Sequence, residues 1–567
     1  MYNLLIGGAA GQGVDTMTAI IERILKRSGY YVFTTRDLMS RIRGGHNFSL
    51  LRFGNKPITS HSYSLDGIIA LNDETLELHK EKLRSDVRSF ILGDTKLISD
   101  DSRLIKVALV GIAKELGNPV VLGSVALGAV LKLFGEGIEN CEDILKLFVK
   151  SEYIDVNKKA FQAGYNAVEA RFEHLPGAEA QGIDDMALIT GSKAVALGAI
   201  AAGLKFYSAY PMSPATAIME YLASKMLECE IVVEQAEDEI AAINMAIGAS
   251  YAGAVAMTGT SGGGFSLMVE ALGLSGMAEI PLVVVNVQRP GPTTGLPTRT
   301  EQSDLKFVVS ASQGEFPRMV IAVRNQEDSF YQTIRAFHIA EKYQMPVIIL
   351  SDQYIGDSSA TIKAYDVKQF VSAVANSGAS DLGCECDDSY LRYRLTENGI
   401  SPRLFPGNGS CLVTSDSDEH DENGSITESA VVRTQMMDKR MHKLKLIEPD
   451  LMEPEFMGAE DFETLLVGWG STWGPIKEAI EVLNSTGDKR FGALLFGDVF
   501  PVPLKKIKEL SIRAKQIVNI EQNATGQFGG MLREYAGVEF SSSILKYDGR
   551  QISAEEIVSK VQKGEWS

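Results

Sequence analysis

One segment of the chain combines a carboxylate, a run of small residues and a glycine-rich turn. Glu239 opens the stretch EIAAINMAIGASYAG, and an apolar run leads from there to Gly262 and Gly263 in TSGGG. Glycine lets a flat ligand or another backbone approach unusually closely. A carboxylate that loses water when a ligand binds is a candidate for proton transfer. The segment therefore predicts part of a cofactor site, with Glu239 as the catalytic candidate.

Three other acids, Glu234, Glu237 and Asp238, stand just before Glu239. Acidic residues are favoured near the start of a helix by the helix dipole alone, which explains most of this cluster. Glu239 differs because it directly precedes the small-residue stretch.

Two loops carry groups that suit the carboxylate of a ligand. Ser213 in YPMSPAT lies between a predicted strand and a predicted helix, where a hydroxyl and free N–H groups can bind a carboxylate. Capping of that helix by Ser213 explains the motif equally well. The loop RPGPTTGLPTRT holds Arg289 and Arg299 among prolines. Two arginines in so stiff a loop favour binding of a ligand carboxylate over surface salt bridges within the protein.

The N-terminal turn GGAAGQG is a possible anion site, because it joins a predicted strand to a helix. Its spacing is neither GxGxxG nor a Walker A loop, which disfavours a dinucleotide-binding oxidoreductase. Gly11 and Gly13 are candidate contacts for a phosphate group, and a tight structural turn is an equal alternative. Arg43 in RIRGGHNFS could clamp an anionic ligand. A solvated loop explains that second motif equally well.

Composition narrows the class of protein. The 567 residues carry a net charge of −18, which argues against a nucleic-acid partner. No apolar run reaches the roughly 20 residues of a membrane span. The five cysteines form no CxxC pair, so we expect no iron–sulfur cluster and no metal site in this chain, and Cys384 and Cys386 are interpreted as neighbours by chance. These features favour a cytoplasmic protein.

Apolar runs that alternate with helical patterns predict an α/β fold with three doubly wound parallel-sheet domains. The domains are expected at residues 1–173, 186–360 and 461–567. Residues 174–185 lack periodicity and are interpreted as a linker. Residues 361–460 are rich in Gly, Asp, Ser and Pro and are predicted to be an irregular connecting segment.

Together the motifs resemble the 2-oxoacid:ferredoxin oxidoreductases, thiamine-diphosphate enzymes that convert a 2-oxoacid and coenzyme A to acyl-CoA and CO2. GGAAGQGV and RIRGGHNFS are similar to signatures of the γ domain of that family, and YPMSP is similar to its YPITP motif. The segment from Glu237 to Met268 resembles its pyrimidine-binding (PYR) domain, and EQNATGQFGGMLRE resembles its transketolase C-terminal-like domain. The resemblance covers nearly the whole chain and implies an α subunit with a γ-type domain fused in front.

The resemblance also implies a partner. In the family, Mg2+ and the diphosphate are held by a GDG…NN motif in a separate domain, and this sequence contains neither GDG nor NN. The implied enzyme is active only with a β subunit that carries this half of the thiamine diphosphate site, Mg2+ and a [4Fe-4S] cluster. A complex of composition (αβ)2 that reduces ferredoxin is expected. Coenzyme A is the implied co-substrate, with Gly11, Gly13 and Arg43 as possible contacts.

Residue roles follow from the same resemblance. Glu239 falls on the glutamate that hydrogen-bonds N1′ of the aminopyrimidine, with Glu237 as the alternative. Ser213 replaces the threonine that contacts the substrate carboxylate, and Arg299 is the implied substrate arginine, with Arg289 as the alternative. The fused arrangement resembles 2-oxoglutarate enzymes, so 2-oxoglutarate is the expected substrate. Pyruvate, a branched-chain 2-oxoacid, or a non-catalytic scaffold role are the alternatives.

Overall fold

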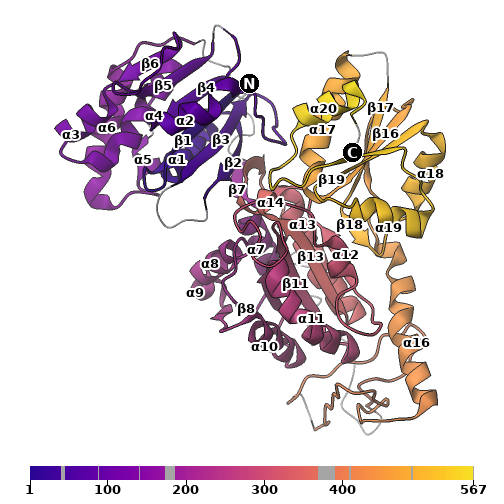
Figure 1. Cartoon of the computed structure of the whole chain (residues 1–567). Coiled ribbons are helices and arrows are strands. Elements are labelled where there is room, and N and C mark those ends of the chain that lie inside the picture. The colour runs from indigo at the N-terminus through magenta and orange to yellow at the C-terminus, as the bar shows by residue number, and fades with distance from the viewer. Residues whose placement is uncertain are drawn as a thin grey trace. The chain divides into compact units, whose positions relative to one another are not determined.

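The structure is a computed structural model that describes residues 1–39, 45–86, 88–139, 141–172, 185–367, 390–407, 410–486 and 490–565. Within these residues the chain has an α/β fold with three sheets, as predicted (Figure 1). It divides into two compact units. One is formed by Met1–Thr190, Asp357–Ala364 and Ser553–Glu555, and the other by Gly191–Gly356, Tyr365–Ile552 and Glu556–Ser567.

The first unit is built on one sheet with apolar packing on both faces. The strand order is β6 (Leu104–Val107), β5 (Phe90–Asp94), β4 (Gly67–Ala70), β1 (Tyr2–Ala9), β3 (His46–Gly54), β2 (Tyr31–Asp37), β14 (Ser359–Lys363) and β7 (Met186–Thr190). Its helices are α1 (Val14–Arg27), α2 (Asp73–His79), α3 (Leu109–Glu115), α4 (Leu122–Leu133), α5 (Cys141–Leu145) and α6 (Ile154–Asn166). Leu4 and Ile6 join one apolar cluster and Leu5 joins another, because alternate side chains of a strand point to opposite faces.

The strands of this sheet are parallel from β6 to β1 and antiparallel from β1 to β7. The sequence places Met186–Thr190 at the start of the second α/β segment. In the structure this strand instead pairs with β14 in the first sheet. The chain therefore leaves and re-enters the first unit through two neighbouring strands, which a reading of local pattern does not reveal.

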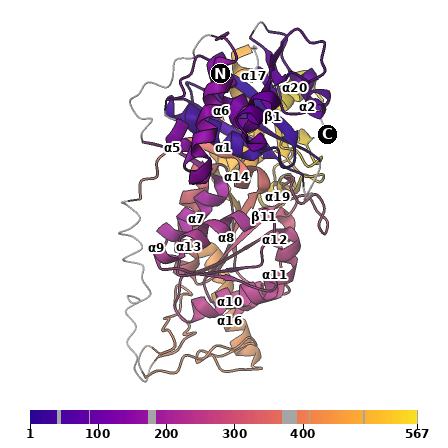
Figure 2. The same cartoon turned by 90° about the vertical axis from the view of Figure 1, so that its left-hand side faces the viewer.

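The second sheet has the order β18 (Asp498–Phe500), β12 (Met319–Ala322), β13 (Pro346–Asp352), β11 (Leu282–Gln288), β10 (Ala256–Thr260), β8 (Phe206–Ala209) and β9 (Val232–Gln235). The strands from β12 to β9 are parallel. Around them lie α7 (Gly191–Ala201), α8 (Thr216–Ser224), α9 (Met226–Cys229), α10 (Glu239–Tyr251), α11 (Gly262–Met277), α12 (Leu305–Val309), α13 (Gln326–Tyr343) and α14 (Gln353–Asp357). Helices α7, α8 and α13 pack together, as do α10 and α11 (Figure 2).

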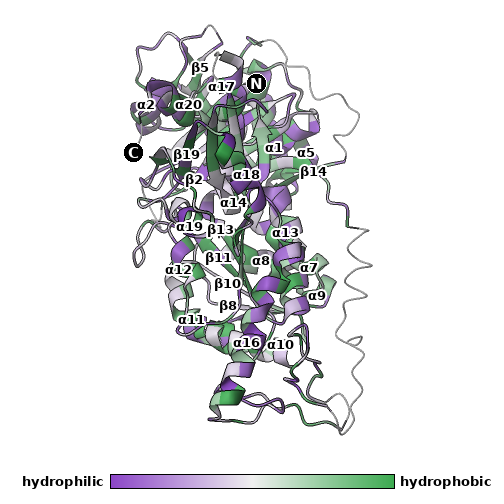
Figure 3. Cartoon of the chain, turned by 90° about the vertical axis from the view of Figure 1, so that its right-hand side faces the viewer, coloured by the Kyte–Doolittle hydropathy of each residue, from purple (hydrophilic) through white to green (hydrophobic). Residues whose placement is uncertain are grey.

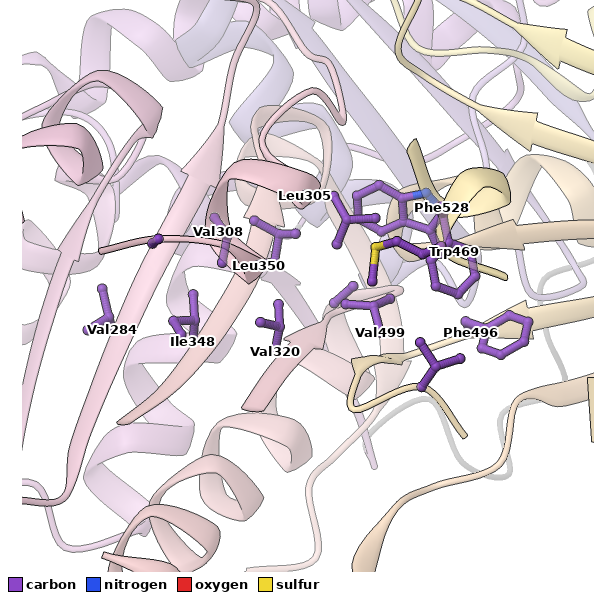
Figure 4. Close-up of a cluster of buried hydrophobic side chains, with 14 of the residues drawn as sticks. Val284, Leu305, Val308, Val320, Ile348, Leu350, Trp469, Phe496, Val499 and Phe528 are labelled. Carbon is purple, nitrogen blue, oxygen red and sulfur yellow. The ribbon is translucent and has the colours of Figure 1, made fainter. Parts of the chain in front are cut away.

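The third sheet, with the elements around it, is called the C-terminal domain below. Its strand order is β15 (Glu455–Gly458), β17 (Phe491–Phe496), β16 (Thr464–Trp469), β19 (Gln516–Glu521) and β20 (Ser542–Leu545). Its helices are α17 (Trp473–Thr486), α18 (Lys505–Arg513), α19 (Gln527–Ala536) and α20 (Ala554–Lys563). One apolar cluster joins the second and third sheets, with Val320 and Leu305 on one side and Trp469 and Phe528 on the other (Figure 4). This shared core fixes the C-terminal domain against the second sheet.

The segment predicted to be irregular contains a helix, α16 (Ala430–Leu446), which is a correction to the sequence interpretation. The helix has no continuous apolar stripe, and Figure 3 shows hydrophilic residues along it. Its buried side instead presents Lys439 and Lys443 to the carboxylate of Glu279, with Nζ–Oε distances of 2.7 and 2.5 Å. Burial acts to raise the pKa of Glu279, but the two lysines hold it well below its ordinary range.

His420 is fully buried, with its ring centroid 4.0 Å from that of Tyr393. Burial lowers the pKa of this imidazole. Among the described residues, none of the helices is long and apolar enough to cross a membrane.

Candidate active site

The carboxyl ends of β8, β9, β10 and β11 lie at one edge of the second sheet, because these strands are parallel neighbours. Ligands bind at this edge in open α/β sheets. The loop of Ser213 follows β8, Glu239 follows β9, the glycine turn follows β10, and Arg289 follows β11. The sheet thus brings together candidate residues that are up to 76 positions apart in the sequence.

Glu239 is the first residue of α10 and is only 4% exposed. Asp238 caps the helix by accepting a hydrogen bond from the backbone N–H of Ala241 at 2.7 Å, as the dipole argument anticipates. Glu237 is exposed. Across the described ranges no partner is found for the Glu239 carboxylate, so it is a buried acceptor that a ligand can satisfy.

The glycine turn at the start of α11 lets the neighbouring groups approach closely. A Cβ atom added at Gly264 would overlap Oε1 of Glu239, and one at Gly262 would lie 2.5 Å from Oδ2 of Asp304. At Gly263 the same atom would lie 3.3 Å from Cε of Met212. A side chain at Gly262 or Gly264 would therefore displace one of the two carboxylates.

The loop of Ser213 is tied to the loop that follows β11. Nη1 of Arg289 donates a hydrogen bond to the backbone carbonyl of Ser213 at 2.6 Å. Helix α8 starts at Thr216 and Ala215 occupies its N-cap without a side-chain bond, so Ser213 does not cap it. The capping alternative is therefore wrong. Ser213 is exposed, and no partner for its hydroxyl occurs among the residues that the structure describes.

The two arginines of the loop differ in their surroundings. Arg289 is 8% exposed, and burial lowers the pKa of its guanidinium while nearby Asp304 acts in the opposite direction. Arg299 is half-buried, donates from Nη1 to the carbonyl of Thr298 at 3.3 Å, and packs its stem beside Gly549. Of the two, Arg289 is the one in contact with Ser213.

Sequence reasoning missed Asp304. Its Oδ2 accepts a hydrogen bond from Nδ2 of Asn286 at 3.1 Å, and its backbone N–H donates to Oε1 of Gln288 at 3.1 Å. Burial raises the pKa of Asp304 to about 6, although the bond from Asn286 and the charge of Arg289 oppose this change. In the sequence Asp304 stands before α12 like an ordinary N-cap, but it makes no capping bond. In the sequence, only its position at the end of the loop of Arg289 and Arg299 could have marked Asp304 as a site residue.

The N-terminal candidates lie in the first unit. Gly11 and Gly13 have φ angles of 92° and 78°, so the turn itself requires glycine there. Among the residues that the structure describes, no atom lies within 4 Å of a Cβ added at either position. A cavity of about 780 Å³ opens beside Gly13, between α1, α4 and α6, and includes Lys150 and Tyr153 in its lining. Arg43 lies outside the described residues.

Comparison with known proteins places these elements in a family. Residues 197–439 match the family model described as pyruvate flavodoxin/ferredoxin oxidoreductase, thiamine diP-bdg, and residues 3–167 match pyruvate ferredoxin/flavodoxin oxidoreductase. The chain is 32% identical to the 2-oxoacid:ferredoxin oxidoreductase subunit alpha of a Sulfolobus species, over 98% of this chain and 95% of that protein. The chain belongs to the 2-oxoacid:ferredoxin oxidoreductase family. It is therefore a subunit of an oxidoreductase with a thiamine diphosphate-binding domain.

Two further comparisons bear on this 2-oxoacid:ferredoxin oxidoreductase subunit. It is 34% identical to the 2-oxoglutarate oxidoreductase subunit KorA of Mycobacterium tuberculosis, over 76% of this chain and 66% of that protein. Its fold is similar to a structure of 2-oxoglutarate:ferredoxin oxidoreductase from Magnetococcus marinus with 2-oxoglutarate, coenzyme A and succinyl-CoA bound. That match has a TM-score of 0.90 and 30% identity, and it covers 99% of both chains.

The residues at the edge of the second sheet fit the cofactor of the family. An aminopyrimidine ring needs a hydrogen-bond partner for its ring nitrogen and room for a flat face. Glu239 offers a buried acceptor without a partner in the described part of the chain, and the glycine turn beside it carries no side chains. Residues 197–439, which match the thiamine diphosphate-binding model, include Ser213, Glu239 and Arg289.

Proposed function

We propose that this chain is the α subunit, with a γ-type domain fused in front, of an enzyme that oxidatively decarboxylates 2-oxoglutarate. With coenzyme A the products are an acyl-CoA, CO2 and reduced ferredoxin. The observation that carries the proposal is the buried Glu239 carboxylate, which has no partner among the described residues and lies against the glycine turn, at the same sheet edge as the Ser213–Arg289 contact. The 2-oxoglutarate enzymes among the similar proteins support the choice of substrate.

In this proposal the chain holds the pyrimidine half of thiamine diphosphate, which supplies carbanion stabilisation when bound. Glu239 shares a proton with N1′ of the ring. Gly262 and Gly263 carry no side chain that would block the approach of the ring. A carboxylate enclosed in this way keeps its proton-transfer role away from bulk water.

The loop after β11 supplies two arginines, one for each carboxylate of a dicarboxylic oxoacid. The Ser213 hydroxyl and Arg289 are proposed to bind the carboxylate next to the keto group, because they lie together near Glu239 and the glycine turn. Arg299, ten positions further along the loop, is proposed to bind the distal carboxylate. A bidentate guanidinium suits either role. Pyruvate and branched-chain 2-oxoacids, which lack a distal carboxylate, are the alternative substrates.

A β subunit completes the enzyme in this proposal. The chain lacks GDG and NN sequences, and its full-length relatives are named as alpha subunits. The partner would hold Mg2+, the diphosphate and a [4Fe-4S] cluster in an (αβ)2 assembly that reduces ferredoxin. Gly11, Gly13 and Arg43 are proposed contacts of coenzyme A, supported at Gly11 and Gly13 by the space that the described residues leave beside the turn. A cytoplasmic location stays a prediction.

The test is to purify the chain with its β subunit and assay a panel of 2-oxoacids with coenzyme A and a viologen acceptor. We expect the highest kcat/KM with 2-oxoglutarate and no turnover without coenzyme A. A preference for pyruvate would replace the substrate while keeping the class. Failure to oxidise any 2-oxoacid would overturn the function and favour a scaffold role.

A further inference from the structure

The C-terminal motif EQNATGQFGG takes no part in the proposed chemistry, yet it contacts the arginine loop of the second sheet. The loop between β11 and α12, residues 289–304, is called the substrate loop here. At Gln302 of this loop, the backbone N–H donates to the carbonyl of Gln522 at 2.7 Å, and the backbone carbonyl accepts from Nδ2 of Asn523 at 3.1 Å. The side chain bonds to the same domain, with Nε2 donating to the carbonyl of Trp469 at 2.8 Å and Oε1 accepting from the N–H of Gln522 at 3.1 Å.

Glu521 orients the residues of the C-terminal domain that contact Gln302. Its buried carboxylate accepts hydrogen bonds from Nε1 of Trp469 at 3.1 Å and from Nδ2 of Asn523 at 2.8 Å. It also accepts from the backbone N–H groups of Phe528 and Gly529 at the start of α19, at 3.0 and 2.9 Å. One acid thus orients two of the groups that hold Gln302, and the helix N-terminus stabilises its charge.

Gln527, the first residue of α19, holds the end of the loop. Its Nε2 donates to the carbonyl of Ser303 at 2.8 Å, and its Oε1 accepts from the N–H of Lys306 at 2.9 Å. Asp304 lies between the two residues that Gln527 contacts. Its carboxylate packs against Gly262 and accepts a hydrogen bond from Asn286. Leu305 is buried with Trp469 and Phe528 in the shared core (Figure 4).

We propose that the segment from Glu521 to Gln527 is a positioning element of the active site. It clamps the substrate loop through Gln302 and Ser303 and the start of α12 through Lys306, and so sets Arg299 on one side and Asp304 on the other. A loop of 16 residues with two glycines would otherwise lose much conformational entropy when the oxoacid binds. Because the clamp orders the loop before the oxoacid binds, it lowers the KM of the oxoacid. This role rests on the proposed function, because the loop is a substrate loop only if its arginines bind the oxoacid.

Gln527→Glu separates the clamp from the stability of α19. A carboxylate can still accept from the N–H of Lys306, but it cannot donate to the carbonyl of Ser303. An acid at the first helical position is favoured by the helix dipole, so the melting temperature should not fall. In the holoenzyme with its β subunit we expect the KM for 2-oxoglutarate to rise about tenfold, because one hydrogen bond no longer orders the loop before the oxoacid binds, with kcat changed less than about twofold.

Arg533→Gln is the matched control, because it lies on the same helix and makes its ion pair with Glu539, away from the loop. It should leave KM unchanged. Hydrogen–deuterium exchange of the peptide 296–306 in the full chain provides a second readout. Exchange should be faster in Gln527→Glu than in the wild type, and unchanged in Arg533→Gln.

Unchanged KM and unchanged exchange in Gln527→Glu would overturn the clamp. Faster exchange with an unchanged KM would also overturn the positioning role, since the loop would then be held without effect on the substrate. A wild-type holoenzyme that oxidises no 2-oxoacid would overturn the proposed function instead. The exchange experiment still reports in that case whether Gln527 orders the loop.

Discussion

At the scale of single residues, Glu239 and Glu237 provide a matched pair of acids at the start of one helix. Glu239 is buried against the glycine turn and Glu237 is exposed. Glu239→Gln should assemble with the β subunit but lose on the order of 10²–10⁴ in kcat, because the amide cannot share a proton with the pyrimidine. Glu237→Gln should turn over like the wild type. Near-normal kcat in Glu239→Gln would assign the role to another group.

Arg289 and Arg299 can be separated by the number of carboxylates on the substrate. Arg289→Lys removes the fork that reaches the Ser213 loop and should raise KM for every 2-oxoacid, by roughly 10-fold or more. Arg299→Lys should raise the KM for 2-oxoglutarate while leaving that for pyruvate unchanged, because pyruvate has no distal carboxylate. Steady-state kinetics with both substrates tests the assignment, and equal effects of Arg299→Lys on the two KM values would reject it.

Asp304 makes stability depend on pH in a predictable direction. Its pKa is about 6 in the folded chain against 3.8 for an ordinary aspartate, so the folded state holds its proton more tightly. The wild type therefore loses stability as the pH rises from about 4 to about 6. Asp304→Asn keeps an acceptor for Asn286 and should be more stable than the wild type by about 2 kcal/mol at pH 8. In urea titrations the advantage should shrink as the pH approaches 5, and a constant difference would contradict the assignment.

At the scale of elements, α16 is held by buried charge rather than by an apolar stripe. Lys443→Ala leaves the buried Glu279 carboxylate with fewer partners and should destabilise the chain by about 3 kcal/mol. The exposed pair Lys515–Glu463 is a control, and Lys515→Ala should cost less than about 1 kcal/mol. Urea denaturation of the full chain measures both. A small effect of Lys443→Ala would mean that Lys439 alone satisfies Glu279.

The sequence predicted some of these elements and missed others. Buried apolar runs predicted the parallel strands of the second sheet. The structure then shows that these strands bring Ser213, Glu239 and Arg289 to one edge. Helix α16 was missed because its buried lysines carry no 3.6-residue apolar period. Contacts such as Gln302 with Gln522 join residues 220 positions apart, and no local pattern encodes them. Asp304 was hidden because an aspartate before a helix is explained by capping alone.

At the scale of the whole molecule, the proposed function assigns only one half of a cofactor site to this chain. Glu239 is the proposed partner of the pyrimidine and is buried, whereas the sequence lacks the GDG and NN elements that would hold Mg2+ and the diphosphate. Most of the charge of thiamine diphosphate lies on the diphosphate, and that charge needs a metal and donors from elsewhere. We therefore expect the isolated chain to show no calorimetric binding of thiamine diphosphate with Mg2+ at micromolar concentrations.

Addition of the β subunit should restore that binding, and Glu239→Gln in the assembled complex should weaken it by no more than about tenfold, since one hydrogen bond is lost while the diphosphate contacts remain. A micromolar dissociation constant for the isolated chain would refute the divided site. Binding to the β subunit alone, unaffected by this chain, would refute it from the other side. Only a site divided between two chains requires both chains for binding and leaves Glu239 as a minor contributor to affinity with a large effect on turnover.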